Sequence, residues 1–168
     1  MPVAVRPKTN GRSATSSDVV ALLKRDHKAV AEMFAQVEAL GPRAVEQRRK
    51  LGEKICEALV AHSTFEKEQL YPPFRERAED KEEREQILEA FEEHAIVDRL
   101  VEELQGMDAK DERYEAKLMV LIESVKHHVK EEEREVLPVV KELFEPEELL
   151  ELGERFIEAK RDAGLPVP

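Results

Sequence analysis

Histidine and glutamate residues recur at one spacing in two distant parts of this 168-residue chain. His62 is followed four residues later by Glu66, and His128 is followed four residues later by Glu132. Residues four apart on a helix lie on the same face about one turn apart, so each pair presents an imidazole and a carboxylate together. Both groups are ligands of divalent metal ions, which makes metal binding the first chemistry to consider.

The two pairs belong to a longer internal repeat, in which a proline follows and one more histidine precedes. The repeated unit is His62-x3-Glu66-x5-Pro72 and His128-x3-Glu132-x5-Pro138. The upstream histidines lie in the similar segments Asp26-His27-Lys28-Ala29-Val30 and Glu93-His94-Ala95-Ile96-Val97. Each repeat therefore predicts a helical hairpin with one histidine on its first helix and a His-x3-Glu pair on its second.

Hydrophobic residues three and four positions apart predict the helices that carry these residues. In every such helix the histidine or glutamate falls on the stripe that otherwise holds Leu, Val, Ile and Phe. Four long helices and a short fifth are expected at about 18–40, 43–71, 81–105, 111–137 and 146–163. Because proline removes a helical hydrogen bond, we expect an interruption at Pro72-Pro73 and an end near Pro138. The pattern predicts an all-α protein, an antiparallel up-down-up-down four-helix bundle with a short additional C-terminal helix.

The composition divides the chain into three parts. Residues 1–16 contain Pro, Gly, Ser, Thr and basic residues but no acidic residue, and we expect them to form a flexible N-terminal tail. Residues 17–145 carry both repeats and are expected to form the bundle. Residues 146–168 are the C-terminal helix and tail, which either cover the bundle or form a dimer contact.

Four inward imidazoles and two inward carboxylates need partners inside the bundle. Burying a carboxylate alone is costly, and no Lys or Arg lies on the same stripes to pair with Glu66 or Glu132. Metal ions remove this cost because they accept carboxylate and neutral imidazole together. The alternative is a metal-free interaction bundle that uses glutamate-rich faces such as 131–133 and 147–148, although such charge runs are usually solvated helix surface.

Acidic residues outnumber basic ones, 38 to 27, and the formal net charge is -11. Nucleic acids and anionic membranes would be repelled, so neither is an expected partner. The single cysteine, Cys56, excludes an intramolecular disulfide and a cysteine-based zinc or iron–sulfur cage. No apolar run approaches the ~20 residues of a membrane helix, and no secretory signal is evident. We expect a cytoplasmic protein.

The order of the motifs resembles the hemerythrin-like, or HHE cation-binding, family. The resemblance covers about residues 18–143 and is carried by His62-Ser63-Thr64-Phe65-Glu66 with Leu70-Tyr71-Pro72, and by His128-Val129-Lys130-Glu131-Glu132 with Val136-Leu137-Pro138. It implies a non-haem diiron centre in the bundle core, with a bridging oxo or hydroxo group. The implied terminal ligands are His27, His62, His94 and His128, and the implied bridging carboxylates are Glu66 and Glu132.

One departure from the family concerns the third helix. Oxygen-carrying hemerythrins have five histidine ligands, with a His-x3-His pair on that helix. Here the residue four positions after His94 is Asp98, which either supplies an anionic ligand or faces solvent. His127 points roughly 100° away from its neighbouring histidine and is expected not to be a ligand. Tyr71 and Tyr114 are candidates to approach the site, but packing is the expected role of Tyr71, because the other repeat has Leu there.

The resemblance leaves several functions open. The first is binding or sensing of dioxygen; reversible carriage is not expected, because losing a histidine ligand favours ferric iron. The second is enzymatic, with decomposition of hydrogen peroxide in the manner of a catalase, or handling of nitric oxide. The third is iron storage or iron sensing. Iron–sulfur repair relatives carry an extra cysteine-containing segment, which disfavours that subtype for a chain with Cys56 alone. The chain is expected to be a monomer or a homodimer.

Overall fold

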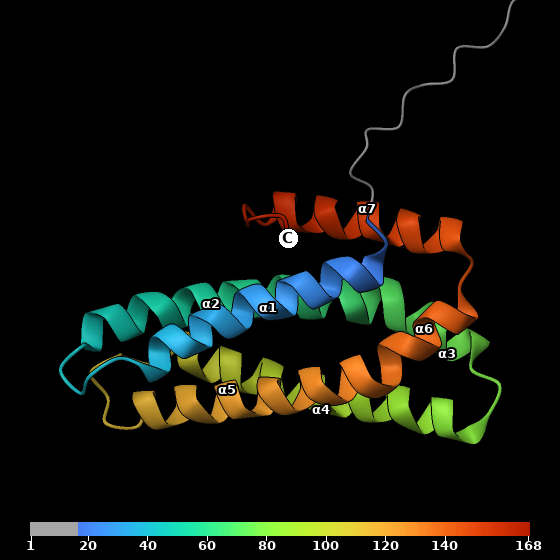
Figure 1. Ribbon diagram of the computed structural model, residues 1–168. Coiled ribbons are helices and arrows are strands. Elements are labelled where there is room, and N and C mark those ends of the chain that lie inside the picture. Colours follow the sequence, from blue (N-terminus) through green and yellow to red (C-terminus); the bar gives the residue numbers. More distant parts are fainter. Residues whose placement is uncertain (1–16) are drawn as a thin grey trace, which may run out of the picture.

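The computed structural model describes residues 17–168, so the tail predicted for residues 1–16 lies outside the described part. Short loops connect helices throughout residues 17–168, and none of these residues lies in a strand (Figure 1). The elements are α1 (Val19–Glu38), α2 (Val45–Phe65), the π-helical turn η1 (Glu66–Leu70), α3 (Tyr71–Arg77), α4 (Lys81–Gln105), α5 (Tyr114–Glu131), the π-helical turn η2 (Glu132–Val136), α6 (Leu137–Leu143) and α7 (Pro146–Asp162). The prediction of an all-α protein is confirmed.

Four long helical rods make up the bundle. They are α1, the continuous run α2–η1–α3, α4, and the continuous run α5–η2–α6, and they run in alternating directions (Figure 1). Helix α7 packs along the outer side of α1 and also contacts α2. The four-helix bundle with an additional C-terminal helix is therefore the architecture that the sequence predicts. No helix in the described part is long and apolar enough to cross a bilayer.

A π-helical turn interrupts the regular α-helix just before Pro72, as expected, but the helix predicted to end near Pro138 continues to Leu143. Each helix passes through a π-helical turn, and the proline lies in the first turn of the helix that follows. In η1 the backbone N–H of Tyr71 donates to the carbonyl oxygen of Glu66, five residues back, so the hydrogen-bond register changes just before Pro72. Both π-helical turns begin at the glutamate of a His-x3-Glu pair, and such turns are frequent at functional sites.

The core consists of two apolar clusters with a polar layer between them. Along α1, the cluster at the end where α3, α6 and α7 meet contains Val19, Val20, Leu22 and Leu23. The cluster at the other end receives Val30, Phe34 and Val37 from α1. The residues between them, and their counterparts on the other rods, are polar and buried: Asp26, His27, His62, Ser63, Glu66, His94, His128 and Glu132. The apolar stripes of all four rods are thus interrupted at one level.

Helix α7 is held closely against the bundle. A Cβ atom at Gly153 would collide with the carbonyl oxygen of Ser17 and lie 3.2 Å from the side chain of Leu22, so a glycine is needed for this approach to α1. At its start, Glu148 accepts hydrogen bonds from Arg77 of α3 at 2.7 and 2.8 Å. The close approach at Gly153 fixes the position of the residues that α7 presents to α1, and the Glu148 pair joins the first turn of α7 to α3.

Candidate metal centre

All six residues predicted as metal ligands meet in the polar layer. They come from all four rods and are at most 7% exposed. Their ligand atoms form two groups, each with all atoms within 4.8 Å of one another. The first group contains His27, His62, Glu66 and Glu132, and the second contains Glu66, His94 and His128.

Glu66 lies between one histidine of each hairpin. Its Oε1 is 3.0 Å from Nε2 of His62, and its Oε2 is 3.2 Å from Nε2 of His94. His27 completes this side of the site, because its Nε2 lies 3.2 Å from Nε2 of His62. Two imidazole nitrogens and a carboxylate oxygen therefore converge on one small volume.

Glu132 occupies the corresponding place on the other side. Its Oε2 is 3.2 Å from Nε2 of His27 and 4.0 Å from Nε2 of His128. Its Oε1 accepts a hydrogen bond of 2.9 Å from the hydroxyl of Tyr71, and this hydroxyl also lies 3.0 Å from Nε2 of His94. The second group therefore has a phenol oxygen beside it.

Two carboxylates outside the groups orient the second-helix histidines. Nδ1 of His62 lies 2.7 Å from Oδ2 of Asp26, and Nδ1 of His128 lies 2.7 Å from Oε2 of Glu93. A proton on Nδ1 that is shared with a carboxylate leaves Nε2 free to bind a metal, which is the usual arrangement around metal-ligating histidines.

The first-helix histidines receive their partners from the opposite hairpin. Nδ1 of His27 lies 2.8 Å from Oε1 of Glu133, and Nδ1 of His94 lies 2.9 Å from Oγ of Ser63. All four histidines thus have Nδ1 occupied and Nε2 directed at the centre.

The donor atoms of the polar layer fit metal ions. Oε2 of Glu66, Nε2 of His128 and Oε2 of Glu132 are buried without a hydrogen-bond partner within residues 17–168. Leaving such atoms unpaired in a protein interior is costly. All three belong to the two groups, and carboxylate oxygen with neutral imidazole nitrogen is a donor set that transition metals accept.

Protons occupy part of the site when metal is absent. Burial disfavours the charged form of His62, but the Glu66 and Asp26 carboxylates outweigh burial and raise the pKa of His62 to about 10. Burial, and then the charge of Glu132, raise the pKa of Tyr71 well above its ordinary value, so the phenol keeps its proton and donates a hydrogen bond to Glu132. A metal ion must displace the His62 proton to reach Nε2, so metal binding competes with protons.

The structure does not bring Asp98 to either group. Its Oδ1 accepts a hydrogen bond of 3.2 Å from Oγ of Ser63, and its other oxygen pairs with Lys67. Lys67 offers Asp98 a cationic partner near the surface, where the carboxylate stays partly hydrated. Asp98 reaches the centre only indirectly, through the Ser63 hydroxyl that contacts His94.

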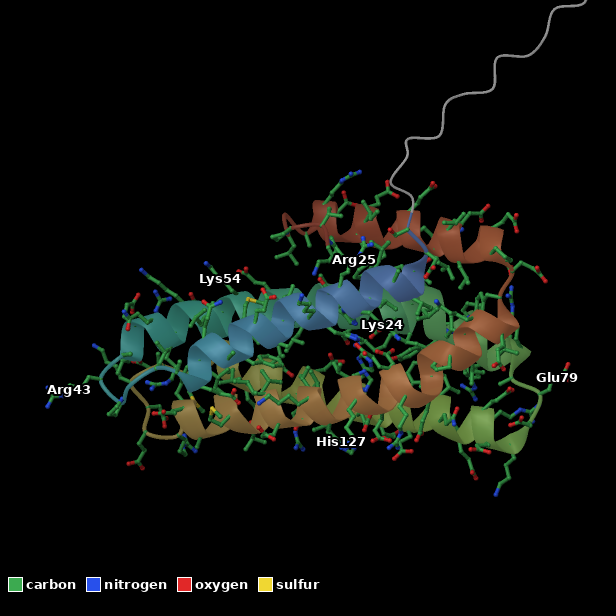
Figure 2. The ribbon with its side chains drawn as sticks, viewed as in Figure 1. Lys24, Arg25, Arg43, Lys54, Glu79 and His127 are labelled. Carbon is green, nitrogen blue, oxygen red and sulfur yellow. The ribbon has the colours of Figure 1, made fainter. Side chains whose placement is uncertain are left out.

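Three other residues considered from the sequence lie outside the groups. His127 is mostly exposed and lies on the outer side of α5 in Figure 2, with its Nε2 3.3 Å from a carboxylate oxygen of Glu93. Tyr114 packs in the apolar cluster remote from α7, with its hydroxyl against Gly52. Cys56 is buried in that same cluster, and burial raises the pKa of its thiol to about 11, so it remains protonated.

Sequence reasoning missed the contacts of five residues with the ligands: Asp26, Ser63, Tyr71, Glu93 and Glu133. Asp26 and Glu93 each precede a first-helix histidine, and this repeated acid–histidine pair was a signal in the sequence. Tyr71 was expected to pack, and its ring does lie 5.3 Å from that of Phe91, but its hydroxyl reaches the centre. The sequence signal for Tyr71 was that it carries a hydroxyl at a repeat position where the other half has the apolar Leu137.

A pocket of about 210 Å³ leads from the surface to the histidines. Its outer lining includes the exposed residues Ala31, Lys126 and Lys130, so it opens between α1 and α5. In Figure 2, nitrogen and oxygen atoms crowd between α1 and the ribbon of α5 and α6. The lining between this mouth and the centre is largely apolar, and all four histidines form the inner end: Val30, Phe34, Leu59, Val97, Val125, His27, His62, His94 and His128.

Antiparallel helices that direct buried histidine and glutamate side chains at one point define a metal-binding helical bundle. The chain belongs to the hemerythrin HHE cation binding domain family, whose model matches residues 18–140. Among solved structures, it is similar to an HHE cation-binding domain-containing protein from Mycobacterium kansasii, an Rv2633c homolog. The two share 22% sequence identity over 88% of each chain, with a TM-score of 0.72, and this likeness supports the fold. Comparison with curated protein sequences gives no match.

Proposed function

We propose that this chain is a non-haem diiron protein that binds dioxygen or a related small oxidant. The observation that carries the proposal is the position of the two glutamates. Each lies between one histidine of each hairpin, as a carboxylate shared by two metal ions must: Glu66 lies between His62 and His94, and Glu132 between His27 and His128. Pairs of iron or manganese ions in four-helix bundles are held by such carboxylate and histidine sets.

The roles of the residues follow from their contacts. The Nε2 atoms of the four histidines would be terminal ligands of the metals, and Glu66 and Glu132 would bridge the metals. Bound iron would supply the electrons for binding or reducing a small oxidant. The pocket beside the histidines admits a small molecule from the surface, and its apolar lining disfavours water there.

Peroxide decomposition is the second candidate, and two observations favour it. The pocket of about 210 Å³ is far larger than the ~10–15 Å³ that a single water-sized ligand requires, so it also admits peroxides. The hydroxyl of Tyr71, hydrogen-bonded to Glu132, is a proton donor next to the second group. Nitric oxide handling and iron storage use the same ligands and remain outcomes of the test.

The first experiment is elemental analysis of protein purified without added metal, followed by anaerobic ferrous loading. We expect about two irons per chain. The reduced protein is then mixed with dioxygen, hydrogen peroxide or nitric oxide in a stopped-flow spectrometer. A stable adduct with dioxygen supports binding or sensing, whereas repeated peroxide turnover supports the enzyme. No bound metal after loading would overturn the proposal and favour the metal-free interaction bundle.

A further inference from the structure

A buried lysine on α7 reaches the surroundings of the centre from outside the family match. Lys160 is 3% exposed, and its Nζ lies 2.7 Å from Oδ1 of Asp26, the one ion pair that it forms within residues 17–168. Helix α7 follows the last matched residue, 140, and lies along the outer side of α1 (Figure 1). A cation from the last helix is therefore built into the polar layer.

Asp26 connects this lysine to a metal ligand. Its second oxygen, Oδ2, lies 2.7 Å from Nδ1 of His62, and Nε2 of His62 lies 3.0 Å from Oε1 of Glu66. One carboxylate oxygen is thus taken by the cation and the other by the imidazole. A carboxylate held at both oxygens cannot rotate freely, so the ring of His62 and the direction of its Nε2 are held as well.

The other hairpin lacks such a clamp. Glu93, the counterpart of Asp26, contacts His128 at 2.7 Å and His127 at 3.3 Å, and no Lys or Arg of residues 17–168 pairs with it. Its side chain is 17% exposed, whereas that of Asp26 is 4% exposed. Water can serve Glu93, but the buried Asp26 depends on Lys160, and Lys160 likewise depends on Asp26.

We propose that Lys160 is a positioning residue of the metal centre. By holding Asp26, it keeps Nε2 of His62 directed at the metal position of the first group, and α7 is thereby part of the centre as well as a cover for the bundle. This role rests on the proposed function as a metal-binding protein. The competing possibility is that Lys160 only neutralises Asp26 for folding.

The test compares Lys160→Met with Lys160→Arg in the full chain. Cobalt(II) is the probe, because its visible absorption reports the geometry of its ligands, and its affinity is measured by competition with a chelator. We expect Lys160→Met to weaken cobalt binding about 10–100-fold, the usual effect of removing an outer partner of a metal ligand, and to change the absorption spectrum. Lys160→Arg retains the positive charge, and we expect its cobalt affinity and absorption spectrum to be close to those of the wild type.

Arg77→Met is the matched control. It removes the ion pair of 2.7 Å that joins α7 to α3 through Glu148, with no contact to a metal ligand. We expect it to lower the melting temperature while cobalt affinity and spectrum stay as in the wild type. If Lys160→Met does not fold, the double variant Asp26→Asn with Lys160→Met removes both charges and is expected to show the same weakened binding and altered spectrum.

The outcomes separate this role from the proposed function. Suppose that the wild-type chain binds cobalt and that Lys160→Met keeps the same affinity and spectrum but melts at a lower temperature. Lys160 would then have a purely structural role. A wild-type chain that binds neither cobalt nor iron would overturn the proposed function and this role with it.

Discussion

The two helical hairpins carry the same pattern and yet surround the centre differently. In each, the acid before the first histidine lies 2.7 Å from Nδ1 of the second-helix histidine, Asp26 with His62 and Glu93 with His128. In each, a π-helical turn begins at the glutamate four residues later. The repeated residues therefore place equivalent atoms at the centre, and residues outside the repeat make its two sides unlike.

Non-repeated residues produce this difference, among them Lys160, Tyr71 and Ser63. Lys160 clamps only Asp26, on the first side. Tyr71 and Ser63 belong to the first hairpin but contact His94 of the second. In the second hairpin the matching positions are Leu137 and Val129, which have no side-chain oxygen, so the hairpins do not exchange equivalent contacts. We expect two metal positions that differ in affinity and spectrum.

The largest effects are expected where the hairpins are most alike. Glu66→Gln and Glu132→Gln should weaken metal binding to a similar extent, because each carboxylate lies near a histidine of both hairpins. The loss of affinity should exceed the about 10–100-fold that is typical when a residue hydrogen-bonded to a metal ligand is removed. Metal content is measured by elemental analysis. Glu131→Gln is the control, because the Glu131 carboxylate pairs with Arg134 and not with a predicted ligand. A full metal complement in either variant would remove that residue from the bridging position.

Metal removal tests both sides together. Without metal, the unpaired atoms of Glu66, His128 and Glu132 remain buried, so the metal-free protein should be less stable. At a metal concentration 100 times Kd the stabilisation is about 2.7 kcal/mol, or about 5–10 °C in melting temperature for a chain of this size. Calorimetry with and without metal measures it. Equal melting temperatures would argue for the metal-free bundle, and Glu66→Gln should show a much smaller shift.

Substituting the two orienting acids sharpens the contrast between the hairpins. Asp26→Asn is expected to weaken metal binding about 10–100-fold, and Glu93→Gln only a few-fold, since Glu93 is partly exposed and is not held by a lysine. Chelator competition gives both affinities. Equal losses would mean that Lys160 does not distinguish the two sides.

Tyr71→Phe removes the oxygen that only one repeat supplies. The hydroxyl donates a hydrogen bond of 2.9 Å to Glu132 and lies 3.0 Å from Nε2 of His94. A hydrogen bond to a charged group contributes about 1.5–3 kcal/mol, so we expect roughly tenfold weaker metal binding with a changed spectrum. Leu137→Met, at the matching buried position, should leave both unchanged. Identical spectra for Tyr71→Phe and the wild type would limit Tyr71 to packing.

Asp98→Ala is expected to have the smallest effect. The carboxylate contacts Ser63 and Lys67 and no atom of either group, so iron content and absorption should match the wild type. A changed spectrum with reduced iron would show that Asp98 moves to the metal when it binds.

Much of this molecule follows from local periodicity. Hydrophobic spacing predicts all five helical segments, and a side chain four residues from another on a helix must share its face. Because His62 and Glu66, or His128 and Glu132, lie on the apolar stripes, any bundle that buries those stripes brings them inside. The internal repeat extends this reasoning to His27 and His94. The six residues that converge in the bundle could therefore be predicted without knowledge of how the helices pack.

The remaining contacts depended on which rods face each other and at what height, which no local pattern specifies. Tyr71 reaches His94, and Glu133 reaches His27, because rods distant in sequence meet at one level of the bundle. The helix continues past Pro72 because a π-helical turn shifts the register of the backbone hydrogen bonds just before it. Lys160 showed no sequence signal: it is a charged residue on an amphipathic helix, and only the docking of α7 on α1 buries it against Asp26.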